Sequence, residues 1–148
     1  MAIDDVRFCA TKYLRDCRGY RSASVRPDLA LTAREMLSAA KLTQAGDVLG
    51  VQMTDENSEN INFVVAENGI FVVGSSNYIP YRDISNIDTN YEKKGRLDAI
   101  GILKDDGSSF DLEVKSGDGK LRDAFAVSAF LGAVRARLKD AIPAYRPG

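Results

Sequence analysis

The sequence has no histidine and no tryptophan, and only two of its 148 residues are cysteine. The lack of histidine excludes catalytic triads and dyads that depend on an imidazole base, and it excludes histidine-ligated metal sites. Cys9 and Cys17 alone cannot supply the four ligands of a structural zinc site. We therefore expect a protein that is not an enzyme and that carries no cofactor and no metal.

Long apolar runs are also missing, because no stretch approaches the roughly 18 residues that a membrane-spanning helix needs. Residues 1–5 are acidic and lack the basic-then-apolar order of a signal peptide. We therefore expect a cytoplasmic protein. Cys9 and Cys17 lie on the apolar stripe of an expected helix, where eight residues separate them by about 12 Å along the axis. That distance is too long for a disulfide, so we expect two buried thiols.

Charge is nearly balanced overall but is unevenly distributed along the chain. The formal net charge is −1, made up of +2 for residues 1–47, −6 for residues 48–115 and +3 for residues 116–148. This balance argues against nucleic-acid binding. An acidic middle segment with basic flanks is consistent with mutual attraction inside the fold, or with an acidic face that meets a basic partner.

The first 46 residues predict two helices. Apolar residues recur at spacings of three and four over residues 3–18, and Gly19 is a stop signal. Residues 19–27 read as a connector. A second helix is expected near residues 28–43, where Thr32 and Glu35 have capping-box spacing.

From residue 48 the pattern changes to short strands and tight turns. Asn68-Gly69 predicts a hairpin with a type I′ turn, Asp106-Gly107 predicts a second hairpin, and Pro80 marks an edge strand or a bulge. A long amphipathic helix is expected to close the chain at about Lys139, with Phe125 broadening its apolar surface. The expected strands cover residues 48–53, 61–66, 70–73, 78–91, 97–104 and 110–115.

This order of elements, together with the segment Ile79-Pro80-Tyr81-Arg82-Asp83-Ile84, resembles the pleckstrin-homology-like (PH-like) superfold. The likeness is greatest to small bacterial PH-like and GRAM-like domains, and it covers roughly residues 48–139. It implies a mainly β fold with α-helices, in which an open antiparallel β-barrel over residues 47–139 is capped by a C-terminal helix. Residues 1–46 then form a two-helix extension packed on the same globular unit, and residues 140–148 form a tail.

The resemblance also implies a non-enzymatic interaction module. PH domains commonly bind lipid headgroups through a basic first hairpin loop, but here the clearest hairpin turn, residues 66–69, carries Glu67. We therefore expect no headgroup-specific lipid binding. The leading hypothesis is a protein partner, or a second copy of the chain, bound through a strand edge or the helix–sheet groove.

Two alternatives remain open. One is peripheral binding to anionic membranes through the basic helical flanks. The other is a small-molecule-binding protein or enzyme that uses a barrel-mouth pocket. The candidate interaction surface consists of Lys93, Lys94, Arg96, Arg15, Arg18, Tyr81 and Arg82.

Two loops have a partial likeness to ligand-binding motifs. Residues 55–60 alternate oxygen-bearing side chains like a calcium loop, but Asn60 stands where the glycine is required and Ala66 where the bidentate Glu is required. Residues 117–120 resemble a phosphate-binding loop, but Leu121 replaces the Ser or Thr that would bind magnesium. We interpret residues 55–60 as a solvated acidic loop and residues 117–120 as the turn into the closing helix.

Overall fold

The computed structural model describes residues 3–15, 17–54, 59–88, 99–114 and 122–140. In chain order the helices and strands are α1 (Ile3–Leu14), β1 (Tyr20–Ser22), α2 (Pro27–Ala39), β2 (Val48–Met53), β3 (Ile61–Ala66), β4 (Gly69–Val72), β5 (Asn77–Pro80), β6 (Ile84–Asp88), β7 (Ala99–Lys104), β8 (Ser109–Glu113) and α4 (Arg122–Asp140). Two short 3-10 helices, η1 (Thr43–Ala45) and η2 (Tyr81–Asp83), precede β2 and β6.

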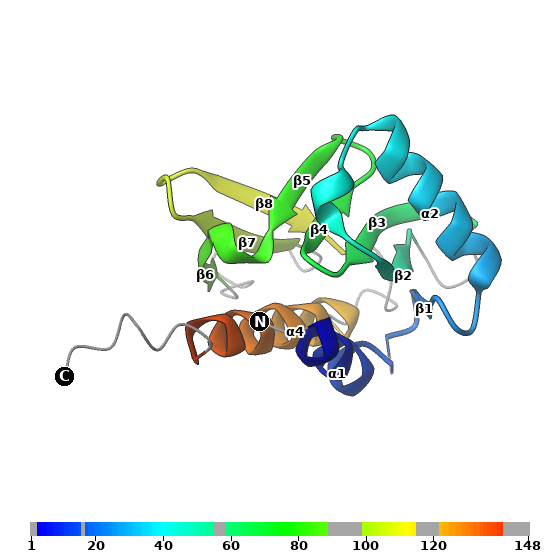
Figure 1. Ribbon diagram of the computed structural model, residues 1–148. Coiled ribbons are helices and arrows are strands. Elements are labelled where there is room, and N and C mark those ends of the chain that lie inside the picture. Colours follow the sequence, from blue (N-terminus) through cyan, green and yellow to red (C-terminus); the bar gives the residue numbers. More distant parts are fainter. Residues whose placement is uncertain (1–2, 16, 55–58, 89–98, 115–121, 141–148) are drawn as a thin grey trace.

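The strands form two antiparallel sheets, one with the order β1-β2-β3-β4-β5 and one with the order β6-β7-β8. Helices α1 and α4 lie side by side against the sheets, and α2 covers the opposite face of the larger sheet (Figure 1). The fold is therefore mixed α/β, with two antiparallel sheets and a C-terminal helix. The described strands do not close into a barrel.

Strand β3 is buried on both faces because it lies between two apolar cores. Phe63 and Val65 point into the core that contains α1 and α4, while Val64 and Ala66 point into the core under α2. Side chains alternate between the faces of a strand, so a strand buried on both sides needs an unbroken apolar run. Burial on both faces explains why β3 ends in the apolar run Phe63-Val64-Val65-Ala66.

Three sequence expectations about the N-terminal segment are wrong: the end of the first helix, the connector and the capping box. Helix α1 ends at Leu14, not near residue 18, and the expected connector contains strand β1, which pairs with β2. Helix α2 begins at Pro27, which suits a first helical position because its missing N–H needs no partner there. The predicted capping box is not formed, and Thr32 Oγ1 instead donates to the Asp28 carbonyl.

The Asn68-Gly69 hairpin forms, but without the predicted type I′ turn, because neither residue has a positive φ. The turn is held from outside instead. The Asn68 N–H donates to the Ala45 carbonyl and the Glu67 N–H donates to the Asp47 carbonyl. The second predicted hairpin has Gly107 at φ 87°, the left-handed conformation that glycine favours.

The long strand expected over residues 78–91 is interrupted. Strand β5 ends at Pro80, η2 turns the chain, and β6 continues in the other sheet. Pro80 does lie on an edge strand, as predicted, where its missing N–H breaks no ladder. Phe125 does not broaden the buried face of α4, because the side chain is 54% exposed.

Candidate functional site

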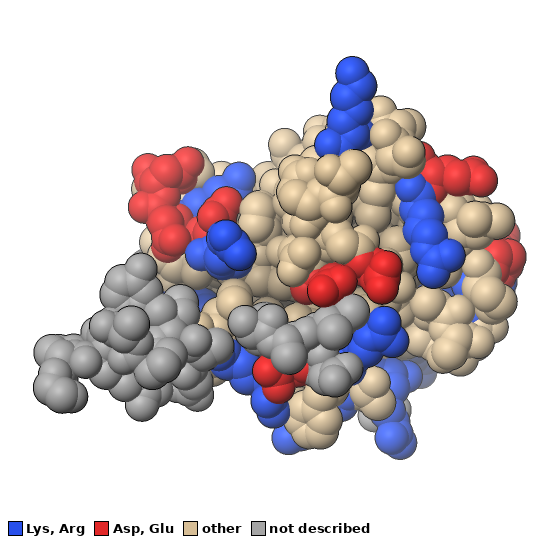
Figure 2. Space-filling model, viewed as in Figure 1, with Lys and Arg blue, Asp and Glu red and all other residues tan. Residues whose placement is uncertain are grey.

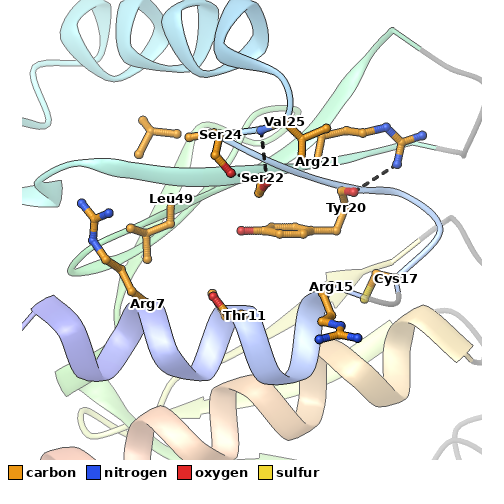
Figure 3. Close-up of a pocket in the computed structure, with 13 residues that line it drawn as sticks. Arg7, Thr11, Arg15, Cys17, Tyr20, Arg21, Ser22, Ser24, Val25 and Leu49 are labelled. Carbon is orange, nitrogen blue, oxygen red and sulfur yellow. Dashed lines mark hydrogen bonds between the residues drawn. The ribbon is translucent and has the colours of Figure 1, made fainter.

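A pocket of about 590 Å³ lies between α1 and the β1 edge of the larger sheet (Figure 3). Its described lining combines three kinds of side chain. Three are arginines (Arg7, Arg15 and Arg21), four carry hydroxyl groups (Thr11, Tyr20, Ser22 and Ser24), and six are small or apolar (Ala10, Cys17, Ala23, Val25, Val48 and Leu49). No Asp or Glu is among these residues.

Helix α1 supplies one wall of the pocket. Arg7, Thr11 and Arg15 follow one another at intervals of four residues, so they share one face of the helix. The opposite face buries Cys9 and Leu14 in the core. The amphipathic pattern of α1 therefore places an exposed, basic face toward the pocket.

Tyr20 forms the centre of the pocket. Its ring packs over Gly50 of β2, where a Cβ would overlap the Tyr20 hydroxyl and lie 2.5 Å from Cζ. In Figure 3 the ring lies between α1 and the sheet, with its hydroxyl pointing toward the side where Leu49 and Arg7 lie. Burial, and next the nearby Cys17, raise the pKa of Tyr20 well above its usual value. The phenol therefore keeps its proton and can donate a hydrogen bond.

The three arginines differ in where they point. In Figure 3 Arg7 lies on the side toward which the Tyr20 hydroxyl points, Arg15 lies at the end of α1, and Arg21 extends away from the Tyr20 ring. Arg21 Nη1 donates to the carbonyls of Arg18 and Tyr20 at 2.7 and 3.1 Å, so the strand itself anchors this side chain. Arg7 Nη2 lies 4.0 Å from Asp47 Oδ2, and the two side chains are 55% and 68% exposed. An exposed ion pair of that length contributes little, so Arg7 is available to another anion.

A buried carboxylate fixes the corner that leads into β1. Asp123 Oδ1 accepts a hydrogen bond from the Arg18 N–H, and Oδ2 accepts from the Gly19 N–H, both at 2.9 Å. Gln52 Nε2 also donates to Oδ2 at 3.0 Å. Asp123 lies in the first turn of α4, where the helix dipole favours a negative charge.

Sequence reasoning did not identify Asp123. Its only signal is an acidic residue at the start of a predicted helix, which is common on exposed helices as well. Its donors, Arg18, Gly19 and Gln52, come from distant parts of the chain.

The structure divides the predicted interaction residues among several places. Arg15 lines the pocket, and Arg18 is exposed at the corner that Asp123 holds. Arg82 is exposed and lines a smaller hollow of about 270 Å³ with Arg135 and Leu138, near the other end of α4. Lys93, Lys94 and Arg96 lie outside the described residues.

Tyr81 is not a surface residue, and its place in the predicted interaction surface is wrong. It is 3% exposed, its hydroxyl donates to the Ala66 carbonyl at 2.7 Å, and its ring meets Phe130 edge-on with 5.9 Å between centroids. The Ile-Pro-Tyr-containing segment therefore places a tyrosine under α4. Tyr81 is part of the core.

The described part of the chain also bears on metal binding and on membrane insertion. No three His, Cys, Asp or Glu side chains gather there in a way that could hold a metal ion. None of the helices described is both long and apolar enough to cross a membrane. Residues 55–58 of the expected acidic loop over 55–60, and the expected turn at residues 117–120, lie outside the described residues.

Comparison with protein-family models, with curated proteins and with solved structures finds no match to this chain.

Proposed function

We propose that this chain is a non-enzymatic, PH-like binding protein whose ligand is a small molecule held in the pocket between α1 and β1. The observation that carries the proposal is the pocket itself. Its volume, about 590 Å³, falls in the range of roughly 300–1,000 Å³ that is typical of ligand sites. Apolar walls with a few convergent hydroxyl groups are the usual composition of such sites.

The order of the strands supports the PH-like part of the proposal. Four antiparallel strands, β2 to β5, are followed by three, β6 to β8, and then by the closing helix α4. Elements α1, β1 and α2 precede this set, and β1 extends the first sheet at its β2 edge. The pocket therefore lies where the N-terminal extension meets the sheet, and not at a barrel mouth.

The chemistry of the lining supports binding without catalysis. Histidine and carboxylate side chains are the common general bases at neutral pH. The described lining has no carboxylate, and the sequence has no histidine. Tyr20 is poorly suited to that role, because burial raises its pKa. The remaining hydroxyl groups of Thr11, Ser22 and Ser24 have no base beside them among the described lining residues. They are suited to orienting a ligand.

The test is a melting-temperature screen against a metabolite panel, run on the natural protein and on Thr11→Trp. Thr11 is exposed on α1 and its side chain lines the pocket, so an indole there fills the site at little cost to the fold. Since a ligand of the native state stabilises it, at least one compound should raise the melting temperature of the natural protein and not that of Thr11→Trp.

Thr32→Trp is the matched control, because Thr32 is exposed on α2, away from the pocket. It should respond to the panel as the natural protein does. A panel that shifts none of the three proteins, or shifts Thr11→Trp equally, overturns the proposal.

A second candidate function rests on the outer face of α1 and α4, which suits an anionic membrane surface. Phe8 is 52% exposed, and its ring centroid lies 6.0 Å from Lys12 Nζ and 5.0 Å from Arg137 Cζ. Figure 2 shows several Lys and Arg side chains gathered along the edge of the molecule where Figure 1 places these helices. An exposed aromatic ring among cations is typical of interfacial helices.

Sedimentation with vesicles tests this second candidate. Binding to phosphatidylcholine vesicles that contain phosphatidylserine should weaken with salt and with Phe8→Ser. Leu31→Ser is the control, because Leu31 is 55% exposed on α2. No binding at low ionic strength removes the candidate. Binding of a protein partner through a strand edge stays a prediction.

A further inference from the structure

We infer that the pocket takes an amphiphilic organic anion, with an apolar body over Tyr20 and a carboxylate, phosphate or sulfonate group at the Arg7 end. This inference rests on the proposed function, because it assigns a chemical class of ligand to the same pocket.

The apolar body follows from the walls. Ala10 of α1 and Val48 and Leu49 of β2 all line the pocket. In Figure 3 Leu49 lies on the side toward which the Tyr20 hydroxyl points. Val25, at the opening, is 69% exposed, so a ligand body would cover an apolar side chain that the fold leaves in water. A small inorganic anion would leave these surfaces uncovered.

The sign and position of the charge follow from the arginines. The Arg7 guanidinium meets Asp47 only at 4.0 Å, and both side chains are more than half exposed. A guanidinium prefers a bidentate contact with an oxyanion, which that geometry does not provide. The Tyr20 hydroxyl points toward the same end of the pocket, and Thr11 lies one helical turn from Arg7 (Figure 3). These groups form a set of hydrogen-bond donors.

The lining also disfavours the other ligand charges. The described lining offers no carboxylate to a cationic ligand, and the Arg7 guanidinium would repel it. A neutral ligand could occupy the apolar walls but would leave the Arg7 guanidinium without an ionic partner at the ligand. An anion uses both parts of the site.

The test compares two fluorescent probes of nearly the same shape. 8-Anilinonaphthalene-1-sulfonate carries the anion, and N-phenyl-1-naphthylamine has the same ring system without the sulfonate. The natural protein should bind the sulfonate with one saturable site and bind the neutral probe about tenfold more weakly, as expected for one charge-assisted contact. Circular dichroism checks that each protein is folded.

Variants then locate the charge. Arg7→Met should weaken sulfonate binding about tenfold and change binding of the neutral probe by less than about twofold, because the methionine keeps the apolar stem. Arg34→Met, at an exposed position on α2, should change neither.

The outcomes separate the inference from the proposed function. If both probes bind equally, if Arg7→Met affects both alike, or if neither probe binds, the anion assignment is overturned. If a probe binds the natural protein and Thr11→Trp abolishes that binding, the pocket binds small molecules. The proposed function then stands even where the anion assignment is overturned. If Thr11→Trp leaves binding of the sulfonate probe unchanged, that probe binds outside the pocket, and the assignment of an anionic ligand to the pocket fails. The melting-temperature screen against the metabolite panel then decides the proposed function separately.

Discussion

Gln52 Nε2 donates a hydrogen bond to Asp123 Oδ2 over 3.0 Å, and both side chains are completely buried. The bond joins a strand of the larger sheet to the start of the closing helix, across 71 positions of sequence. The Arg18 and Gly19 N–H groups also donate to the same carboxylate. Because a buried charge is tolerated only when it is well hydrogen-bonded, this cluster fixes the sheet, α4 and the α1–β1 corner at one point.

The hydrogen bonds to Asp123 predict that the nearly isosteric substitution Asp123→Asn lowers the stability of the protein strongly. In Asp123→Asn the side chain loses its charge, and an NH₂ group must face at least one of the three donors, so a buried donor loses its acceptor. We expect a loss of about 3 kcal/mol in the free energy of unfolding, measured by urea denaturation. Asp105→Asn is the control, since Asp105 is exposed in the β7–β8 turn and should change stability by less than about 0.5 kcal/mol. Equal effects of the two substitutions contradict the assigned role of Asp123.

The contact between Tyr20 and Gly50 predicts opposite effects of two Gly-to-Ala substitutions. Gly50→Ala should destabilise the protein by about 1–3 kcal/mol, because the new methyl group meets the Tyr20 ring and the Arg21 carbonyl at 2.8 Å. Gly132→Ala should stabilise it by about 0.5–1 kcal/mol, because Gly132 lies within α4 with no atom near the added Cβ.

A double mutant tests the cause of the Gly50 effect. Combined with Tyr20→Ala, the Gly50→Ala substitution should cost less than it does alone, since the ring is gone and only the Arg21 carbonyl remains close. Strictly additive losses in urea denaturation would show that the ring contact is not what makes Gly50 necessary.

The partly buried Tyr20 and the buried Tyr81 predict alkaline unfolding. Burial is the main cause that raises the pKa values of Tyr20 and Tyr81 above the usual value of 10.0. The folded state therefore keeps two protons that the unfolded chain releases above pH 10. Stability from this source is intact below about pH 10 and falls as the pH rises further. Absorbance near 295 nm reports tyrosinate directly, because the chain has no tryptophan.

We expect Tyr20 and Tyr81 to ionise only together with the loss of the circular dichroism signal. Tyr20→Phe should make the decline in stability between about pH 10 and 12 less steep, because one of the linked protons is removed. Reversible titration of all six tyrosines near pH 10 in a folded protein contradicts this prediction.

The thiols predict low reactivity in the native state. Cys9 and Cys17 are both buried and unbridged, and burial is the main cause that raises the pKa of Cys9. A disulfide reagent at pH 8 should therefore react at least about 100-fold more slowly with the folded protein than with the protein in urea. Fast reaction of one equivalent without denaturant would mean that one thiol is accessible.

Among the described strands, those predicted well are the ones whose residues are buried along nearly the whole strand. Strands β2 and β3 have the predicted bounds, and nearly all of their residues are buried. Such a strand is visible in the sequence as an apolar run bounded by polar residues. The Asn68-Gly69 turn was predicted as a hairpin, but its conformation was wrong. The N–H groups of Asn68 and Glu67 donate to the carbonyls of Ala45 and Asp47 in the preceding segment, so tertiary contacts and not local preference select the turn.

The candidate site was predicted only in fragments. Arg15 was identified as a surface cation, but nothing in the sequence placed it beside Tyr20, which the sequence assigned to a connector. Tyr81 was included in the candidate interaction surface together with its neighbour Arg82. The structure buries it against Phe130, since η2 turns the chain under α4.

The sequence by itself determined the succession of two helical segments, short strands and a closing helix, because local periodicity and turn residues specify each element. It also determined the absence of imidazole chemistry. Only the tertiary structure decided that Asp123 is buried, that Tyr20 packs on Gly50, and that α1 and β1 enclose a basic pocket. Those relationships join residues up to 105 positions apart, and no local pattern encodes contacts that chain folding creates over such separations.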